Sequence, residues 1–448
     1  MELVWGFIVL LACLLIGVRH GGLGLAVISG IGLIVYTFIF GYQPGSPPVD
    51  VILTILAVVT CAGYLQTSGG LTIMLKFAEK ILRKNPKYIT ICAPITTFIL
   101  IVLCGTGHVV YTVYPIIYDI AIKQNIRPER PMAVSATASQ AGIMASPASV
   151  GLVSMAGFIS VYYPNITIVD LLIVSIPSIF CGLLCAAIWS MYRGKNLEDD
   201  ACFQERIKNP EQKAYIYGNR AESLIGKKFP KEYTLAAVFF LLGIACIAVF
   251  GSNPLLLPHF TTGTGQIKTI SMTVLIQMIM LLVSAVILLT CNVKAKDVGE
   301  STVFKAGMTA IVCVYGVAWM ADTFFTNYIP YFKEFISSFV SAYPWTYAVL
   351  LFLTSKFVNS QAAAVAIVVP LALAAGVDPV IIISFISATY AYFFIPTYPS
   401  DLACINFDRS GTTKIGKYIL NHSFMATGMI TVVVGCCVGY IIAHLMIF

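Results

Sequence analysis

Charged side chains are scarce in this sequence. Asp, Glu, Lys and Arg make up 10% of its 448 residues, whereas soluble globular domains contain roughly 25%. Hydrophobic residues make up 58%, and the mean hydropathy is +0.89. This balance leaves too little charge to cover a water-exposed surface, so it excludes a soluble globular protein.

Clustered histidines and C-x-x-C cysteine pairs are also lacking. The five histidines (20, 108, 259, 422 and 444) are scattered, and the 13 cysteines show no C-x-x-C spacing and mostly lie inside apolar runs, where free cysteine behaves as a small hydrophobe. We therefore expect no disulfide framework, no metal site and no cofactor. An enzyme within the membrane would need a nucleophile–base pair or clustered ligands, and no motif supplies them, so we do not expect an enzyme.

Long apolar runs dominate what remains. A membrane-spanning helix takes about 20 mostly apolar residues, and the chain holds about ten such runs, which predicts a polytopic protein in a lipid bilayer. Residues 3–18 have no basic residue before them and no small-residue cleavage site after them. They are expected to form a first transmembrane helix and not a cleaved signal peptide.

The order of elements in the first half can be followed from its interruptions. We expect plain helices, a surface helix with one apolar side, a re-entrant hairpin interrupted at 105–108, and a broken helix interrupted at 146–149. The expected ranges are 3–18, 23–40, 50–66, 71–84 (surface helix), about 88–122 (hairpin), about 132–161 (broken helix) and 169–192.

The second half repeats this order after a hydrophilic stretch. Its hairpin is expected to be interrupted at 355–361 and its broken helix at 396–401. Ser135-Ala136-Thr137 recurs as Ser387-Ala388-Thr389, and a proline stands twelve residues after each serine. The expected ranges are 233–250, 270–291, 303–325, 330–341 (surface helix), about 345–375 (hairpin), about 380–407 (broken helix) and 419 to the end.

The fold class predicted from this pattern is an all-α polytopic membrane protein with two inverted repeats. Residues 1–192 form the first repeat, 193–232 a cytoplasmic linker that is not a folded domain, and 233–448 the second repeat. Each repeat has five transmembrane helices and one re-entrant hairpin. Because five is odd, the second repeat is inverted, and both termini lie on the periplasmic side.

Positive charge supports this topology. If each hairpin returns to the side it entered from, all of the 27 Lys and Arg residues except Lys268, Lys333 and Lys356 fall on one face or in its loops. The positive-inside rule makes that face cytoplasmic. The net charge of +7 is thereby explained by topology, and no nucleic-acid partner is expected.

The interruptions are the expected substrate site. Non-helical backbone is tolerated at membrane depth only where it is buried in protein or lines a watery cavity. Half-helix N-termini at such breaks favour anionic groups, which suits a small carboxylate-bearing solute. The candidate substrate-binding residues are Gly105, Thr106, Gly107, His108, Ser146, Pro147, Ser149, Lys356, Asn359, Ser360, Gln361, Thr397, Pro399 and Ser400.

The sequence leaves more than one role open for each of the charged candidate residues. Lys356 is either a counter-charge for a substrate carboxylate or a cation that snorkels from the hairpin mouth. Asp401 would repel an anion unless it binds a cation or proton or pairs with Lys356, so a coupling or regulatory role is expected. Glu79 and Arg83 form an (i, i+4) pair that is either solvated or part of the transport pathway. Arg127 either draws in anions or sets topology.

Five stretches together resemble the anaerobic C4-dicarboxylate transporter (Dcu) family, of the DcuA/DcuB type, over essentially the whole chain. They are Arg83-Lys84-Asn85-Pro86-Lys87-Tyr88, Gly105-Thr106-Gly107-His108-Val109-Val110-Tyr111-Thr112, Asn125-Ile126-Arg127-Pro128-Glu129-Arg130-Pro131, Asn359-Ser360-Gln361-Ala362-Ala363 and Pro396-Thr397-Tyr398-Pro399.

The resemblance implies exchange of fumarate, malate or aspartate for succinate across a bacterial inner membrane during anaerobic respiration. It also implies an elevator mechanism, as in the broader ion-transporter superfamily, and a homodimer. An Na⁺- or H⁺-coupled dicarboxylate symporter shares this architecture and remains the alternative. A channel would leave the repeated hairpins without a purpose.

The resemblance also assigns roles to charged positions. It implies a part in transport for Glu79, Arg83 and Arg127, and a part in regulating a sensor kinase for Lys356, Thr397 and Asp401 in DcuB-like members. The superfamily's Ser-Asn-Thr tips are replaced here by Gly-Thr-Gly and Asn-Ser-Gln. This departure weakens the expectation of sodium sites at the tips.

Overall fold

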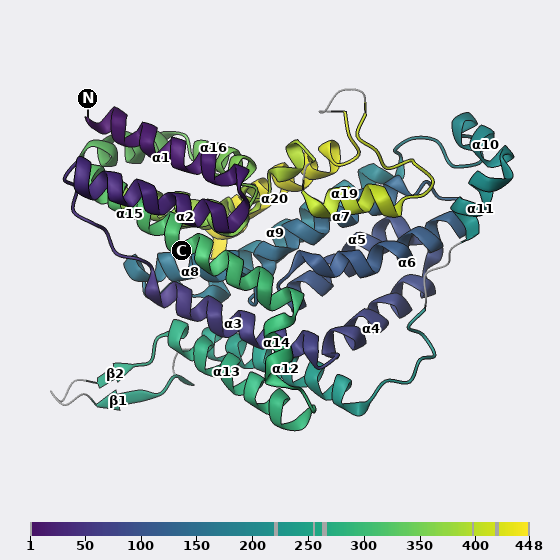
Figure 1. The fold of residues 1–448 in the computed structure, drawn as a ribbon, viewed down its shortest axis with the longest axis horizontal. Coiled ribbons are helices and arrows are strands. Elements are labelled where there is room, and N and C mark those ends of the chain that lie inside the picture. Colours follow the sequence, from purple (N-terminus) through teal and green to yellow (C-terminus); the bar gives the residue numbers. More distant parts are fainter. Residues whose placement is uncertain are drawn as a thin grey trace.

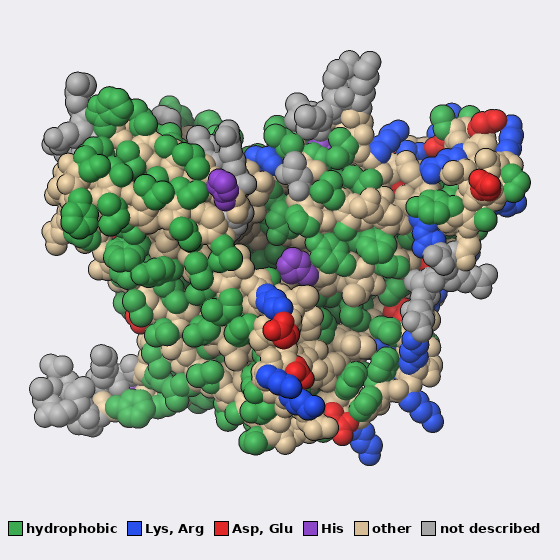
Figure 2. Space-filling view, in the orientation of Figure 1, with side chains coloured by type: hydrophobic (Ala, Val, Ile, Leu, Met, Phe, Trp, Pro, Cys, Tyr) green, Lys and Arg blue, Asp and Glu red, His purple; other side chains and the backbone are tan. Residues whose placement is uncertain are grey.

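The structure is almost entirely helical (Figure 1). The computed structural model describes residues 2–218, 223–253, 256–261, 267–396, 398–416 and 421–446. Within these residues, eight helices are long and apolar enough to cross a membrane by length and composition. Figure 2 shows hydrophobic side chains over much of one face, with charged side chains along its right edge and in a column from its middle down to its lower edge. The predicted all-α polytopic membrane class is confirmed.

The first half consists of helices separated by short turns. They are α1 (Glu2–Arg19), α2 (Gly21–Ile34), the π-helical turn η1 (Val35–Ile39), α3 (Val49–Thr67), α4 (Gly70–Lys84), η2 (Pro86–Tyr88), α5 (Ile89–Cys104), η3 (Gly107–Val109), α6 (Val110–Lys123), α7 (Glu129–Ala141), η4 (Gly142–Ala145), α8 (Val150–Tyr162) and α9 (Ile168–Met191).

The linker and the second half contain the remaining elements. They are α10 (Ala201–Lys208), α11 (Pro210–Gly218), α12 (Lys231–Ser252), β1 (His259–Thr261), β2 (Ile267–Thr269), α13 (Met272–Thr290), α14 (Ala295–Glu300), α15 (Thr302–Ala342), α16 (Trp345–Val358), α17 (Gln361–Ala374), α18 (Pro379–Ser384), η6 (Ile386–Thr389), η7 (Tyr392–Phe394), α19 (Pro399–Phe407) and α20 (Met425–Met446). The antiparallel β1–β2 pair was not predicted.

The two halves differ at the predicted surface helices. In the first half, α3 and α4 are separate, because the chain turns at Gly69 with a φ of +80°, which favours glycine. In the second half, the separate surface helix predicted at 330–341 is wrong. Those residues continue the 41-residue helix α15, and residues 317–342 contain no glycine at which the chain could turn in the same way.

The interruptions of the second half also lie elsewhere than predicted. The hairpin between α16 and α17 is interrupted only at Asn359, which has a φ of +51°, and at Ser360. The broken helix leaves α-helical geometry after Ser384, passes through the short 3₁₀ helices η6 and η7, and becomes α-helical again at Pro399. Proline is well suited to the first position of a helix, so Pro399 begins α19 and does not interrupt a helix.

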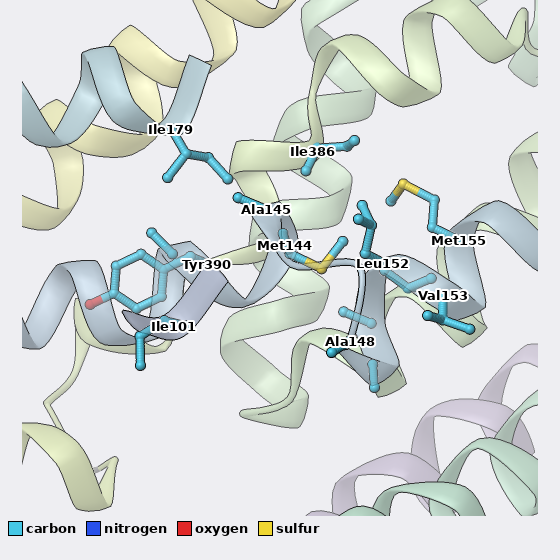
Figure 3. Packing of buried hydrophobic residues seen from close by; sticks show 14 of the residues in the cluster. Ile101, Met144, Ala145, Ala148, Leu152, Val153, Met155, Ile179, Ile386 and Tyr390 are labelled. Atoms are coloured by element: carbon cyan, nitrogen blue, oxygen red, sulfur yellow. The ribbon is translucent and has the colours of Figure 1, made fainter. Parts of the chain in front are cut away.

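The halves pack against each other through glycine and through the breaks. Between α9 and α20, a Cβ on Gly182 would lie 2.4 Å from the carbonyl oxygen of Thr431. Small residues allow such close helix approach where lipid provides no hydrophobic driving force. Figure 3 shows Ile386 of the second half beside Ala145 and Met144, next to the first break. The breaks are thus buried in protein, as irregular backbone requires.

The linker is attached to several helix ends. Tyr118 donates to the carbonyl of Ile216 (3.2 Å), Lys76 to that of Lys227 (2.6 Å), and Arg206 to that of Ser410 (2.8 Å). Instead of a bare loop, the linker contains α10 and α11 and joins α4, α6 and the segment after α19. Figure 1 shows the two chain ends on the side of the molecule away from α10 and α11.

Candidate functional site

An open cavity lies where the two hairpin tips (residues 105–108 and 359–361) and the two breaks (residues 146–149 and 385–398) meet α3 and α15. It encloses about 820 Å³ of empty space, including its mouth. Its lining is Val59, Ala62, Cys104, Gly105, Thr106, Gly107, His108, Gln140, Ile143, Ala148, Val150, Gly151, Val303, Ala306, Gly307, Ala310, Asn359, Ser360, Gln361, Ala362, Tyr392 and Tyr398.

Seven of the candidate residues line this cavity. Gly105, Thr106, Gly107 and His108 come from the first tip, and Asn359, Ser360 and Gln361 from the second. The glycines of the first tip permit close contact. Gly105 has a φ of +71°, and a Cβ there would lie 2.4 Å from the carbonyl oxygen of Ala148. The fold therefore places the first tip directly against the first break.

Three helix N-termini face the cavity. Thr106 accepts from the His108 amide (3.4 Å) at the start of η3 and α6. Ser149 accepts from Leu152 (3.2 Å) at the start of α8, and Ser360 from Ala363 (3.3 Å) at the start of α17. The first amides of a helix have no partner within it. Three converging sets of such amides, with the helix dipoles behind them, make the cavity favourable for an anion.

Gln140 was missed by the sequence analysis, yet it links the parts of the polar wall. Its carbonyl accepts from Gln361 Nε2 (3.1 Å), and its Oε1 accepts from the Tyr392 hydroxyl (3.1 Å). A Cβ on Gly107 would lie 2.5 Å from Gln140 Nε2. One residue thus connects both tips and the second break, through its backbone carbonyl and its side chain. An amide inside a predicted membrane segment was the available signal, because polar groups there are rare without a function.

Two tyrosines of the second break complete the polar wall. The rings of Tyr392 and Tyr398 lie 4.5 Å apart between centroids, and both line the cavity. Tyr392 was missed because it stands in an apolar run, where an aromatic residue is ordinary core. Tyr398 lies within the predicted interruption at 396–401 but was not among the candidate residues. Together with Gln140, they make this wall rich in hydrogen-bonding groups.

The opposite wall is apolar and tightly packed. It comes from α3 and α15, and all six of its lining side chains are small or aliphatic (Val59, Ala62, Val303, Ala306, Gly307 and Ala310). A Cβ on Gly307 would lie 2.2 Å from Val59 Cγ1. The cavity therefore has a polar wall, formed by the tips and breaks, and an apolar wall, formed by α3 and α15.

The other uncharged candidates lie outside this lining. Ser146 accepts from the Ala148 amide (3.2 Å), and Ser149 caps α8, so both hydroxyls hold the first break in shape. Pro147 and Ser400 are buried, and Pro399 is exposed at the start of α19. Thr397 lies outside the described residues.

Lys356 lies in the last turn of α16, next to the tip. Its Nζ donates to Asn359 Oδ1 (3.2 Å) and to the carbonyls of Tyr392 (3.3 Å) and Ile395 (3.1 Å). In the described part of the chain, no carboxylate lies within ion-pair distance of it. Lys356 thus connects the second tip to the second break and keeps an uncompensated positive charge behind the polar wall.

Asp401 lies in the first turn of α19, behind Tyr398. Its side chain is 1% exposed, and neither carboxyl oxygen has a hydrogen-bond partner among the described residues. The pairing with Lys356 that we considered is not formed. Asp322, another acidic residue in an apolar helix, differs because it accepts from the Ser46 amide (2.9 Å).

Glu79 and Arg83 lie at the linker and not in the cavity. Glu79 is fully buried. It accepts from Arg83 Nε (2.7 Å), Ser223 Oγ (2.7 Å) and the Leu224 amide (2.8 Å), and Arg83 also contacts Asp119 (3.2 Å). Burial alone raises the pKa of Glu79, but these hydrogen bonds and the charge of Arg83 outweigh it, so its pKa is lowered. The solvated alternative is therefore wrong for Glu79.

Arg127 belongs to a second cluster of this kind. It contacts Glu129 (2.8 Å) and Asp200 (2.7 Å), and Arg193 also contacts Glu129 (3.0 Å). Asp200 and Arg193 are linker residues. The cluster ties the linker to the start of α7, away from the cavity lining.

Comparison with known proteins decides the family. Residues 2–447 match the model of the anaerobic C4-dicarboxylate membrane transporter family, DcuA_DcuB. The chain belongs to this family. Its members are transporters and not enzymes.

Relatives of this transporter cover nearly its whole length. It is 50% identical to anaerobic C4-dicarboxylate transporter DcuB of Escherichia coli O6:H1, over 97% of both chains. It is 34% identical to C4-dicarboxylate transporter DcuA of Wolinella succinogenes, over 99% of this chain and 100% of that one. Among solved structures, Neisseria gonorrhoeae MtrF, described as illuminating a class of antimetabolite efflux pumps, matches 92% of this chain and 84% of its own, with a TM-score of 0.53 and 14% identity. That likeness concerns the fold alone.

Proposed function

We propose that this transporter exchanges C4-dicarboxylates, taking up fumarate, malate or aspartate against succinate, across the inner membrane of a bacterium. The observation that carries the proposal is the cavity at which three helix N-termini from both halves converge. A dicarboxylate presents two carboxylates, and first-turn amides approach the cavity from more than one side. Family membership and the names of the relatives support the substrate class.

The mechanism we infer is an elevator. The polar wall of tips and breaks moves with its bound substrate along the apolar wall of α3 and α15. The small, aliphatic side chains of that wall offer no hydrogen bond that would have to be broken during the movement. A homodimer would anchor the stationary part.

Two inverted repeats are part of this proposal. The second helix of each half packs against the third helix of the other: α2 lies against α15, and α13 against α3. Reciprocal pairs of this kind are expected when two repeats are related by a twofold axis in the membrane plane. The hydrogen bonds from the linker to α4, α6 and the segment after α19 support one common, cytoplasmic face for these charged segments, with both termini periplasmic.

Exchange is favoured over uniport by electrostatics. Moving a dianion alone against a membrane potential requires work of roughly 2.3 kcal/mol per charge per 100 mV. Exchange of one dianion for another moves no net charge. It therefore lets a cell take up one dicarboxylate and release another without drawing on an ion gradient.

Radiolabelled fumarate uptake into proteoliposomes tests the proposal. Vesicles loaded with succinate in sodium-free buffer are expected to take up fumarate much faster than empty vesicles. Equal uptake by loaded and empty vesicles would contradict exchange. Uptake that requires external sodium and ignores internal succinate would mean a sodium symporter.

A proton-coupled symporter is the second candidate. It is favoured by one observation, the buried carboxyl of Asp401 without a partner. Uptake into empty vesicles that is driven by an inward proton gradient would distinguish it.

A further inference from the structure

Asp401 presents an unusual electrostatic problem. A charged carboxylate buried without a partner is strongly unfavourable, because burial removes hydration that nothing replaces. Its side chain is 1% exposed, and both oxygens lack partners among the described residues. A protonated carboxyl escapes most of this penalty. The environment therefore favours a neutral Asp401 in the conformation described here.

The groups that face Asp401 come from several elements. α6 and α7 pack against α19, and α16 and the second break also approach it. Tyrosine and cysteine are neutral near pH 7, because their ordinary pKa values are about 10 and 8.5. The titratable and charged groups in question are Tyr111 and Tyr114 of α6, Glu129 of α7, Lys356 of α16, Tyr390, Tyr392 and Tyr398 of the second break, Cys404 of α19, and Asp408 at the end of α19.

Three of these groups are Asp, Glu or Lys side chains. Asp408 lies seven residues from Asp401 and accepts hydrogen bonds from Ser410, Thr412 and the Thr413 amide. Glu129 is compensated by Arg127 and Arg193. Lys356 is held by three neutral oxygens, so no neighbouring carboxylate cancels its charge within the described chain. The field behind the polar wall is therefore more positive when Asp401 is neutral than when Asp401 is ionised.

We propose that the carboxyl of Asp401 is a proton-binding site of this transporter, and that it holds a proton while a dicarboxylate occupies the cavity. This inference rests on the proposed function. Loss of the proton places a negative charge behind Tyr398 and offsets Lys356, which disfavours a dianion. By linkage, a proton that strengthens dicarboxylate binding is itself bound more tightly when the dicarboxylate is present.

The proposal connects exchange with symport. When each dicarboxylate travels with the proton in both directions, exchange still moves no net charge. When no counter-substrate is available, the proton reduces the charge carried with a dianion from two to one. Asp401 thus provides a chemical basis for proton-coupled uptake through the same cavity.

The test is fumarate binding to the purified, full-length protein between pH 6 and pH 8, where fumarate is a dianion. For the wild type, we expect Kd to rise with pH, approaching about tenfold per pH unit, the limit for one linked proton. Titration calorimetry in buffers of different ionisation heat should show proton uptake on binding. Asp401→Asn, which cannot ionise, should bind fumarate with a pH-independent Kd and take up no proton.

Asp322→Asn is the matched control, because Asp322 is an acidic residue of an apolar helix outside the cavity lining. It should keep the pH slope of the wild type. The same slope in Asp401→Asn as in the wild type would overturn the proposal.

An infrared measurement keeps the proposal testable if Asp401→Asn does not fold. Wild-type protein with ¹³C-labelled aspartate should gain an isotope-shifted protonated-carboxyl band when fumarate binds at pH 8, and absence of that band would overturn the proposal. Fumarate–succinate exchange measured on the same preparation separates the two claims. Exchange without linkage at Asp401 refutes only the proton site, whereas absence of exchange by the wild type at every pH refutes the proposed function.

Discussion

The two halves of the molecule share an order of elements but carry different chemistry at their breaks. The first break, at Ser146–Ser149, contains no charged residue, and its serines cap and shape the backbone. The second half places Lys356 and Asp401 beside its tip and break, both without an ion-pair partner in the described chain. Both halves thus present helix N-termini to the cavity, through the first tip and break and through the second tip, but only the second half adds Lys356 and Asp401 beside them.

The largest expected effect concerns the first half, whose tip and break contain no Asp, Glu, Lys or Arg. Gly105→Ala puts a Cβ 2.4 Å from the Ala148 carbonyl oxygen at a φ of +71°, so the first tip must move away from the first break. We expect loss of nearly all fumarate exchange in proteoliposomes. Gly30→Ala, with no atom within 4 Å of the added Cβ, is the control and should transport normally. Normal exchange by Gly105→Ala would mean that this contact does not shape the site.

The next largest effect concerns Lys356, the charged residue beside the second tip. Lys356→Met removes the positive charge and the three hydrogen bonds that hold the second tip to the second break. Loss of a hydrogen-bonded charge is worth about 1.5–3 kcal/mol, so we expect fumarate Kd to rise about tenfold or more. At pH 6, adding Asp401→Asn should not restore binding, because the proposed proton already keeps Asp401 neutral there. Restoration in the double variant would indicate an ion pair between the two residues.

A smaller effect is expected where the halves meet. Tyr392→Phe removes the hydrogen bond to Gln140 Oε1 and keeps the ring packed against Tyr398. A neutral hydrogen bond contributes about 0.5–1.5 kcal/mol, so exchange should slow by a factor of about three to ten. Phe394→Leu, which alters a neighbouring aromatic residue outside the lining, is the comparison variant. An unchanged rate for Tyr392→Phe would show that Gln140 does not depend on this contact.

The smallest effect concerns the linker end of the first half. The lowered pKa of Glu79 means that its ionised form stabilises the fold above the ordinary glutamate range and that this contribution is lost as pH falls through the lowered pKa. Glu79→Gln should therefore lower Tm by a few degrees at pH 7. The difference from wild type should shrink in acid, below about pH 4. A difference that grows on acidification would contradict this sign.

Much of the fold and half of the candidate site follow from the sequence, for a physical reason. Apolar run lengths and the predicted interruptions at 105–108 and 355–361 reveal helices and tips because lipid penalises exposed backbone, although the second interruption is shorter than predicted. The continuity of α15 was missed, since an apolar run does not show whether a helix turns or continues. Proline misled the placement of the second break: Pro399 was taken as an interruption, although it begins α19.

The partners of polar side chains were the least predictable part. Gln140 is contacted by Gln361 and Tyr392, more than 200 positions away along the chain, and sequence spacing carries no information about such contacts. The same is true of Glu79, whose partners Ser223 and Leu224 lie in the linker. For Asp401, the sequence showed that an acidic residue near an anion site needs a proton, a cation or a partner, but it did not show that the pair with Lys356 is absent.

A cryo-EM structure of the full-length protein with bound fumarate tests the central claim most directly. The account predicts fumarate density in the cavity between the two tips, with its carboxylates at the first-turn amides of α6, α8 and α17. Density for fumarate elsewhere, with the cavity between Gly107 and Ala362 filled only by solvent, would contradict it.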